Sequence, residues 1–371
     1  QHLLTTSDYF FFLMSIGKEA KLILENGDEF KGFSFGAERS TSGEVVFNTG
    51  MVGYPESLTD PSYKGQILVL TYPLIGNYGV PGKETENNLL KNFESDNIRV
   101  QALVISDYSF EYSHWNAKKS LSEWLKEENI PAIYGIDTRK LTKMLREKGA
   151  MLGKIVFEKE DINFYDPNIV DIVKEVSIRE PIVYNEKPNQ KRIVVVDCGI
   201  KNNIIRNLIK RNLTVVRVPY DYDFLTQFFD GLIISNGPGD PKMCDKAISN
   251  IGRALKHNIP TFGICLGNQL MALAAGGDTY KLKYGHRSQN QPCILANIKR
   301  CFITTQNHGF AVDMKSLSEE WQEFFVNAND GTNEGIKHKT KPFMSVQFHP
   351  EACPGPVDTE FLFDEFVKML K

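Results

Sequence analysis

A cysteine framed by two glycines is the residue of this chain whose setting most favours chemistry. Cys265 lies between Gly263 and Gly267, where an apolar segment meets a predicted helix. This spacing is typical of a nucleophile elbow, a sharp strand-to-helix turn that exposes its central side chain. The helix N-terminus favours the thiolate, which is the nucleophilic form. Without such a frame a free cysteine is more often a small buried hydrophobe, and we expect that role for Cys198, Cys244, Cys293, Cys301 and Cys353.

A candidate base lies near the C-terminal end of the chain. A thiol nucleophile needs a base within hydrogen-bond reach and a third group that orients this base. Residues 345–351 read as a strand that ends in His-Pro-Glu, so His349 can act as the base and Glu351 can orient its imidazole. His308 is a rival base. The pattern favours a triad of Cys265, His349 and Glu351.

A glycine-rich turn follows another apolar strand. Residues 235–241 read Ser-Asn-Gly-Pro-Gly-Asp-Pro, which forms a tight turn in any protein. After a strand, it also lets backbone N–H groups face a developing oxyanion, with the N–H of Leu266 as the second donor. A phosphate-binding loop is not predicted, because Asn77 and Glu84 stand where that motif needs Gly and Ser or Thr. We therefore expect no ATP site in this chain.

Two different patterns of apolar residues predict the elements that position these residues. Beyond residue 191, apolar strands alternate with helices, which predicts a parallel sheet covered on both faces, with its ligand at the carboxyl ends of the strands. Before residue 160, short apolar runs are cut by turns, with a hairpin signal at Asn26-Gly27 and helices expected at 117–128 and 138–148. The predicted organisation is an N-terminal extension at 1–17, a sheet-rich mixed α/β domain at 18–160, a linker at 161–190 and a doubly wound, mostly parallel α/β domain at 191–371.

The composition argues against several classes of function. The 371 residues carry 43 Lys and Arg against 46 Asp and Glu, a net charge of −3 that argues against nucleic acid or an anionic membrane surface as a partner. The cysteines form no disulfide framework or zinc pattern, so we expect no metal and an intracellular protein with reduced thiols. No apolar run is long enough to span a membrane, and no Lys or Arg of a signal or transit peptide precedes Ile16. Because the chain begins with Gln1, we expect that its true N-terminus is missing.

The order and spacing of these motifs resemble the class I, or triad, glutamine amidotransferases. Three further runs, at residues 43–49, 53–63 and 134–139, resemble the small subunit of carbamoyl-phosphate synthetase. The resemblance extends from about residue 21 to the C-terminus, and residues 277–281 and 290–292 look more like the eukaryotic fused forms than the bacterial subunits. The implied fold is the small-subunit N-terminal domain followed by a class I glutamine amidotransferase domain.

The resemblance implies hydrolysis of the side-chain amide of L-glutamine. Cys265 would form a thioester, His349 would protonate the departing ammonia and then activate water, and Glu351 would hold His349. With Ser62 in the N-terminal domain, the glutamine pocket is expected between the domains. The glutamine contacts of the family fall on Ser62, Gly237, Gly239, Leu266, Gln269, Asn307, Gly309 and Phe310.

The resemblance also implies a partner. Ammonia would pass to a carbamoyl-phosphate synthetase large subunit, or to a fused downstream segment, that uses bicarbonate and two ATP. We expect ATP and Mg only in that partner and no cofactor in this chain. The expected compartment is the cytoplasm, or the mitochondrial matrix if a transit peptide is missing from the chain. The sequence leaves open whether carbamoyl phosphate serves pyrimidines, arginine or urea.

Two observations keep alternatives open. Asn268 occupies a position where many relatives carry His, and one branch of the family has lost the cysteine and uses free ammonia. A catalytically silent regulatory or docking chain is therefore an alternative. An amidotransferase of another synthase, or a thiol hydrolase of related fold, is disfavoured by the N-terminal run at residues 59–63.

Overall fold

The computed structural model describes residues 17–158 and 160–370. The predicted extension at 1–17 lies, apart from Gly17, outside the described residues. The chain forms two compact units, and each unit is built from separate segments. Among the described residues, the first unit comprises 17–49, 65–82, 100–158 and 160–166, and the second comprises 50–64, 83–99 and 167–370. Segments 50–64 and 83–99, which the sequence prediction placed in the N-terminal domain, therefore pack within the second unit.

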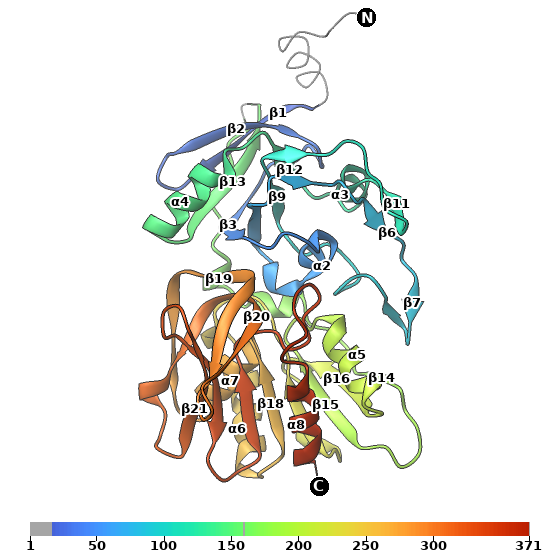
Figure 1. Ribbon diagram of the computed structural model, residues 1–371, viewed down its shortest axis with the longest axis vertical. Helices are drawn as coiled ribbons and strands as arrows, with labels where there is room; N and C mark the ends of the chain where they lie inside the picture. The colour runs from blue at the N-terminus through green and yellow to red at the C-terminus, as the bar shows by residue number, and fades with distance from the viewer. Residues whose placement is uncertain (1–16, 159, 371) are drawn as a thin grey trace, which may run out of the picture. The chain divides into compact units, whose positions relative to one another are not determined.

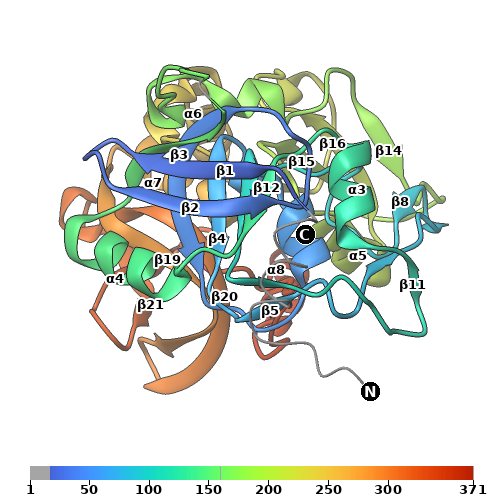
Figure 2. The same ribbon diagram turned by 90° about the horizontal axis from the view of Figure 1, so that it is seen from above.

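The first unit is a closed barrel in the strand order β1-β13-β3-β4-β9-β12-β2 (Figure 2). Neighbours are parallel from β3 through β4 and β9 to β12, and the other pairs are antiparallel. Closure leaves no unpaired edge. The barrel strands are β1 (Glu19–Leu24), β2 (Glu29–Ser34), β3 (Thr41–Asn48), β4 (Gln66–Leu70), β9 (Ala102–Val104), β12 (Ala132–Tyr134) and β13 (Met151–Phe157).

Local sequence explains the small elements of this unit. The Asn26-Gly27 turn joins β1 to β2 as an antiparallel pair, which confirms the predicted hairpin. Helix α4 (Thr138–Lys148) has the predicted bounds. The helix expected at 117–128 is shorter: Ser120 closes a capping box with Glu123 and starts α3 (Leu121–Glu127). The short strands are β5 (Leu74–Ile75), β6 (Val80–Pro81), β10 (Asp107–Tyr108) and β11 (Ala117–Lys119).

The second unit contains a sheet in the order β14-β16-β15-β17-β18-β23-β22-β21-β19-β20 (Figure 1). The five strands from β16 to β23 in this order are parallel, as the apolar segments predicted. The strands are β14 (Ile182–Tyr184), β15 (Arg192–Asp197), β16 (Thr214–Pro219), β17 (Gly231–Ile234), β18 (Thr261–Ile264), β19 (Asp278–Leu295), β20 (Arg300–Asp313), β21 (Trp321–Asn327), β22 (Asn333–His338) and β23 (Phe343–Val346).

Helices cover both faces of the parallel part. Along β15, Ile193 and Val195 join one core cluster with α5 and α8, whereas Val194 and Val196 join the opposite cluster with α6 and α7. This alternation confirms a doubly wound α/β domain. The helices of the unit are α2 (Tyr54–Thr59), α5 (Asn202–Lys210), α6 (Asp245–Lys256), α7 (Leu266–Ala274) and α8 (Phe361–Met369), and β7 (Thr85–Glu86) pairs with β8 (Leu89–Leu90).

Short 3₁₀ turns complete the fold of the described residues. They are η1 (Pro61–Tyr63), η2 (Pro167–Ile169), η3 (Ile172–Glu175), η4 (Phe224–Thr226), η5 (Pro241–Met243) and η6 (Met314–Ser316). The turn η1 carries Ser62. Among the described residues, every helix is too short or too polar to cross a bilayer.

Candidate active site

Cys265 lies at a sharp turn between β18 and α7. Its φ of 55° is in the left-handed region, which residues other than glycine rarely adopt outside constrained sites. A Cβ at Gly263 would lie 2.5 Å from the carbonyl oxygen of Gly267, and one at Gly267 would lie 2.1 Å from the carbonyl oxygen of Ile234. Only glycine fits at either position. The structure thus contains the strand-to-helix elbow that the sequence predicts.

The parallel neighbour of β18 supplies the candidate base. His349 follows the end of β23, and its backbone N–H donates to the carbonyl of Thr305 at 2.9 Å. Its Nδ1 lies 2.6 Å from Oε1 of Glu351, and both side chains are buried. A carboxylate can only accept, so Nδ1 carries the proton. The other ring nitrogen, Nε2, is buried without a hydrogen-bond partner among the described residues.

A lysine that the sequence analysis missed completes this group. Nζ of Lys201 lies 3.0 Å from Oε1 of Glu351 and donates to the carbonyl of Ala352 at 2.5 Å. The Lys201 side chain is only 2% exposed. In the sequence, a single lysine before a helix looks like any surface lysine. Only the fold brings it to Glu351.

The charges of these groups support one another. Burial would raise the pKa of Glu351, but Lys201 and His349 lower it to about 2. Burial would lower the pKa of His349, but the charges of Glu351 and Cys265 outweigh it and raise this pKa to about 10. Glu351 is therefore ionised at neutral pH. The raised pKa of His349 favours the imidazolium form of this side chain at neutral pH.

The rival base, His308, has a different environment. Its Nδ1 faces the carbonyl of Phe310 at 2.8 Å, and its Nε2 faces Oε1 of Gln306 at 3.1 Å. Burial, together with the charge of His286, lowers its pKa well below the usual value. Both ring nitrogens are engaged within the protein core. His308 is thus a poor candidate for the base, and His349 is the better one.

Residues of the 50–64 segment form a polar network next to the elbow. Asn307 donates from Nδ2 to Oδ2 of Asp60 at 3.0 Å, and Asn236 donates from Nδ2 to Oγ of Ser62 at 2.9 Å. The Cys265 thiol lies 3.7 Å from the carbonyl oxygen of Asn307. Ser62 therefore reaches the site from within the second unit. This corrects the expectation of Ser62 in a separate N-terminal domain, which assumed that residues adjacent in sequence share a domain.

Of the remaining predicted glutamine contacts, some pack near the elbow, whereas two glycines have their nearest neighbours elsewhere. A Cβ at Gly237 would lie 2.8 Å from Leu266, so this glycine packs directly against the elbow. Gln269 donates to the carbonyl of Phe310 at 2.9 Å. The nearest atoms to a Cβ at the other two glycines belong elsewhere: a Cβ at Gly239 would lie 2.6 Å from Ile172, and one at Gly309 would lie 3.3 Å from Arg287.

Asn268, which departs from the pattern of many relatives, points into the protein. Its Nδ2 donates to Oε1 of Gln347 at 3.1 Å, and its Oδ1 accepts from Oγ of Ser345 at 2.7 Å. All three residues are fully buried. Asn268 thus joins α7 to β23, the two elements that carry the cysteine and precede the histidine. Asp60, Asn236 and Gln347 are further polar residues that sequence reasoning did not single out, although all three lie within motifs that it noticed.

A cysteine on an elbow, beside a buried His-Glu pair at the carboxyl ends of parallel strands, is equipped for nucleophilic attack on a carbonyl group. Residues 194–369 match the family model described as Glutamine amidotransferase class-I, so this part of the chain belongs to that class. Residues 22–155 match the model described as Carbamoyl-phosphate synthase small chain, CPSase domain. The chain accordingly joins a small-chain CPSase domain of carbamoyl-phosphate synthase to a class-I glutamine amidotransferase domain.

Curated relatives agree with this assignment. The chain is 56% identical over 94% of its length to Multifunctional protein CAD of Squalus acanthias, covering 16% of that protein. It is 52% identical over 94% of its length to Multifunctional protein pyr1-3 of Dictyostelium discoideum, covering 17% of that protein. It is 50% identical over 97% of its length to the mitochondrial Carbamoyl-phosphate synthase [ammonia] of Homo sapiens, covering 24% of that protein. The chain therefore spans less than a quarter of the length of these relatives.

Proposed function

We propose that this chain hydrolyses the side-chain amide of L-glutamine and delivers the ammonia to a carbamoyl-phosphate synthetase subunit or fused segment. One observation carries the proposal: Cys265 lies on an elbow beside a His349–Glu351 pair whose Nδ1 and Oε1 are 2.6 Å apart. Membership in the class-I amidotransferase family supports the choice of glutamine.

In the first half of the reaction, the Cys265 thiolate attacks the carboxamide carbon. The developing oxyanion is stabilised by the N–H of Leu266, one of the first N–H groups of α7, which have no partner within the helix. The backbone of Gly237, packed against Leu266, is the proposed second donor. When the tetrahedral intermediate collapses, the C–N bond breaks, His349 gives its Nε2 proton to the leaving nitrogen, and ammonia and a thioester result.

In the second half, neutral His349 takes a proton from water through Nε2. The hydroxide attacks the thioester carbon, the C–S bond breaks, and the Cys265 thiolate and glutamate are released. Glu351 accepts from Nδ1 throughout and stays ionised, since Lys201 and His349 hold its pKa at about 2. The triad returns to its starting protonation state.

The proposed substrate contacts surround this centre. The network of Asp60, Ser62, Asn236 and Asn307 gives a polar wall that can hold the charged end of glutamine, because its amides and carboxylate are already oriented by one another. The wall lies within the second unit. Further proposed contacts are Gly237, Gly239, Leu266, Gln269, Gly309 and Phe310.

Ammonia is best transferred without release to water. At neutral pH free ammonia is protonated and loses its nucleophilicity, so a sequestered path to the synthetase preserves reactivity. The relatives are several times longer than this chain, which supports a fused synthetase segment or a separate large subunit as the partner. ATP, Mg and bicarbonate would be used there, with no cofactor in this chain.

The alternative is a silent regulatory or docking chain of an ammonia-dependent synthetase, which the Homo sapiens relative, a Carbamoyl-phosphate synthase [ammonia], favours. A glutaminase assay separates the two. We expect the wild-type chain, with and without a synthetase partner, to release ammonia from glutamine. The Cys265→Ala variant should lose this activity, while Cys301→Ala, which removes an exposed cysteine, should retain it. Ammonia release that survives Cys265→Ala would refute the mechanism, and an inactive wild type in the presence of its partner would support the silent chain.

A further inference from the structure

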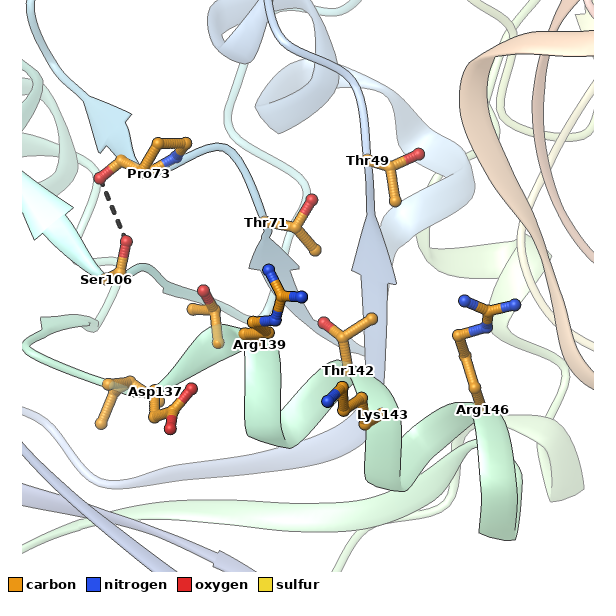
Figure 3. A pocket seen from close by; sticks show the side chains of 11 residues that line it. Thr49, Thr71, Pro73, Ser106, Asp137, Arg139, Thr142, Lys143 and Arg146 are labelled. Carbon is orange, nitrogen blue, oxygen red and sulfur yellow. Dashed lines mark hydrogen bonds between the residues drawn. The ribbon is translucent and has the colours of Figure 1, made fainter.

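A pocket lies in the first unit, whereas the residues assigned to glutamine hydrolysis belong to the second unit. Its volume is about 550 Å³, within the range of small-molecule sites. Figure 3 shows side chains from several barrel segments converging on it. The lining residues are Thr49, Thr71, Pro73, Ser106, Ile136, Asp137, Thr138, Arg139, Thr142, Lys143 and Arg146.

The pocket occupies the place where parallel sheets bind ligands. Thr49 follows β3, Thr71 follows β4, and Ser106 follows β9, three adjacent parallel strands of the barrel. The carboxyl ends of these strands meet at one edge. Helix α4, which follows the fourth parallel strand β12, closes the other side (Figure 3). This is the common position of a ligand site in parallel α/β structures.

The lining carries an excess of positive charge. Arg139, Lys143 and Arg146 are spaced by four and three residues along α4, which places them on one face of the helix. The single lining carboxylate is Asp137, whose Oδ1 already accepts from the backbone N–H of Lys140 at 2.8 Å as the helix cap. Among the residues that the structure describes, no carboxylate lies within ion-pair distance of the three cations.

A polar group between these cations also lacks a partner. The Thr142 side chain lines the pocket, and its hydroxyl oxygen is buried without a hydrogen bond to any described residue. A buried polar atom without a partner is costly unless something else satisfies it. By contrast, the Ser106 hydroxyl donates to the carbonyl of Pro73 at 3.0 Å (Figure 3). The unsatisfied hydroxyl is a second, independent sign of a ligand.

We propose that this pocket binds a small molecule carrying a phosphate group. Two arginines and a lysine without carboxylate partners match a dianionic phosphate, for which arginine offers paired N–H donors. The volume exceeds that of phosphate alone, and Ile136 and Pro73 add apolar lining. These features point to an organic phosphate ester. The proposal does not depend on the glutaminase function.

The test is direct binding by isothermal titration calorimetry, with the whole chain and with inorganic pyrophosphate and phenyl phosphate as probes. Divalent metals are omitted and ionic strength is held constant with sodium chloride, because salt screens general attraction. We expect saturable binding of phenyl phosphate with one site per chain. If neither phenyl phosphate nor pyrophosphate shows saturable binding at millimolar concentration, the proposal is overturned.

Matched variants locate the site. The double variant Arg139→Gln/Arg146→Gln should weaken binding at least about tenfold, since each removes a charge-assisted hydrogen bond. The control Lys140→Gln/Lys148→Gln removes the same charge from the same helix outside the pocket lining. Its affinity should stay within about twofold of wild type. Equal losses in both double variants would show general electrostatic attraction and refute the pocket.

An uncharged variant keeps the test decisive if the arginine changes disturb folding. Thr142→Val preserves shape and removes the unpartnered hydroxyl, so it should not lower the midpoint of thermal unfolding without ligand. We expect it to weaken phenyl phosphate binding several-fold. Unchanged affinity in Thr142→Val together with unchanged affinity in Lys143→Gln would place the phosphate elsewhere.

Discussion

Nζ of Lys201 lies 3.0 Å from Oε1 of Glu351, with the two side chains 2% and 0% exposed. Burial alone would lower the pKa of Lys201, but Glu351, Glu94 and Asp60 raise it above its usual range. A buried carboxylate with this countercharge stays ionised without taking the proton of His349. Lys201 is thus a positioning residue, which acts on Cys265 through Glu351 and His349.

Replacing Lys201 with methionine keeps the length of the side chain and removes its charge. We expect Lys201→Met to destabilise the fold by about 3–5 kcal/mol, since Glu351 is left buried without its countercharge. The pKa of Glu351 should rise, moving the acid limb of the kcat profile to higher pH, and kcat should fall about tenfold to hundredfold. Denaturant unfolding and a pH profile of glutamine hydrolysis measure both effects. Lys210→Met, at an exposed position, is the control; an unmoved acid limb in Lys201→Met would contradict the assigned role.

The stability of the protein should depend on the charge of His349. Its pKa in the folded chain is about 10, above an unfolded value of about 6.5, so its stabilisation is complete below pH 6.5 and disappears as pH rises toward 10. These two pKa values set the window of about pH 7 to pH 10. Within it, the unfolding free energy of wild type should fall more than that of His349→Asn. Urea unfolding at several pH values provides the measurement.

The thiolate contributes to the same effect. Because the charge of Cys265 helps to raise the pKa of His349, Cys265→Ser should reduce the loss of stability at high pH without abolishing it. Identical slopes in wild type, Cys265→Ser and His349→Asn would exclude the charged pair.

The pH dependence of stability that Glu351 contributes has the opposite sign. The pKa of Glu351 is about 2 in the folded chain and about 4.3 when unfolded, so its stabilisation is present above the unfolded value and is lost as pH falls toward 2. Glu351→Gln should remove this part of the acid dependence. The difference between the urea unfolding curves of wild type and Glu351→Gln should shrink as pH is lowered from 6 to the range of about 3.

The elbow glycines leave no space for a side chain. In Gly263→Ala the new Cβ would lie 2.5 Å from the carbonyl of Gly267, so the turn must move and displace Cys265. We expect kcat to fall by about hundredfold or more. The matched control is Gly252→Ala within helix α6, where the nearest atom is an ordinary 3.5 Å away and alanine stabilises a helix by up to about 1 kcal/mol. Normal activity in Gly263→Ala would show that the elbow tolerates a shift.

Ser62→Ala tests the polar wall. Removing Oγ leaves Asn236 Nδ2 without its 2.9 Å partner, so we expect a higher KM for glutamine with a smaller change in kcat. Ser113→Ala, at an exposed position of the first unit, should leave both constants unchanged. An unchanged KM in Ser62→Ala would remove this serine from the substrate site.

The sequence predicts the elements whose local signals are strong. Cys265 and its glycines, the apolar parallel strands and helix 138–148 all carry such signals, and the structure contains each of them. The long antiparallel strands β19 and β20 were not predicted, because their polar residues lack a regular alternation. Lys201 and Asp60 depend on contacts between distant segments, which no local pattern encodes.

The discontinuous units affect how the chain can be divided. The backbone passes from one unit to the other after residues 49, 64, 82, 99 and 166, so no single cleavage separates them. A fragment beginning at residue 191 would match the class-I amidotransferase family model and retain Cys265, His349 and Glu351. It would nevertheless lack Asp60 and Ser62, leaving the amides of Asn307 and Asn236 without their partners. The part of the chain that carries the proposed triad is therefore not an autonomous module, because truncation at residue 191 would remove two side chains of its polar network.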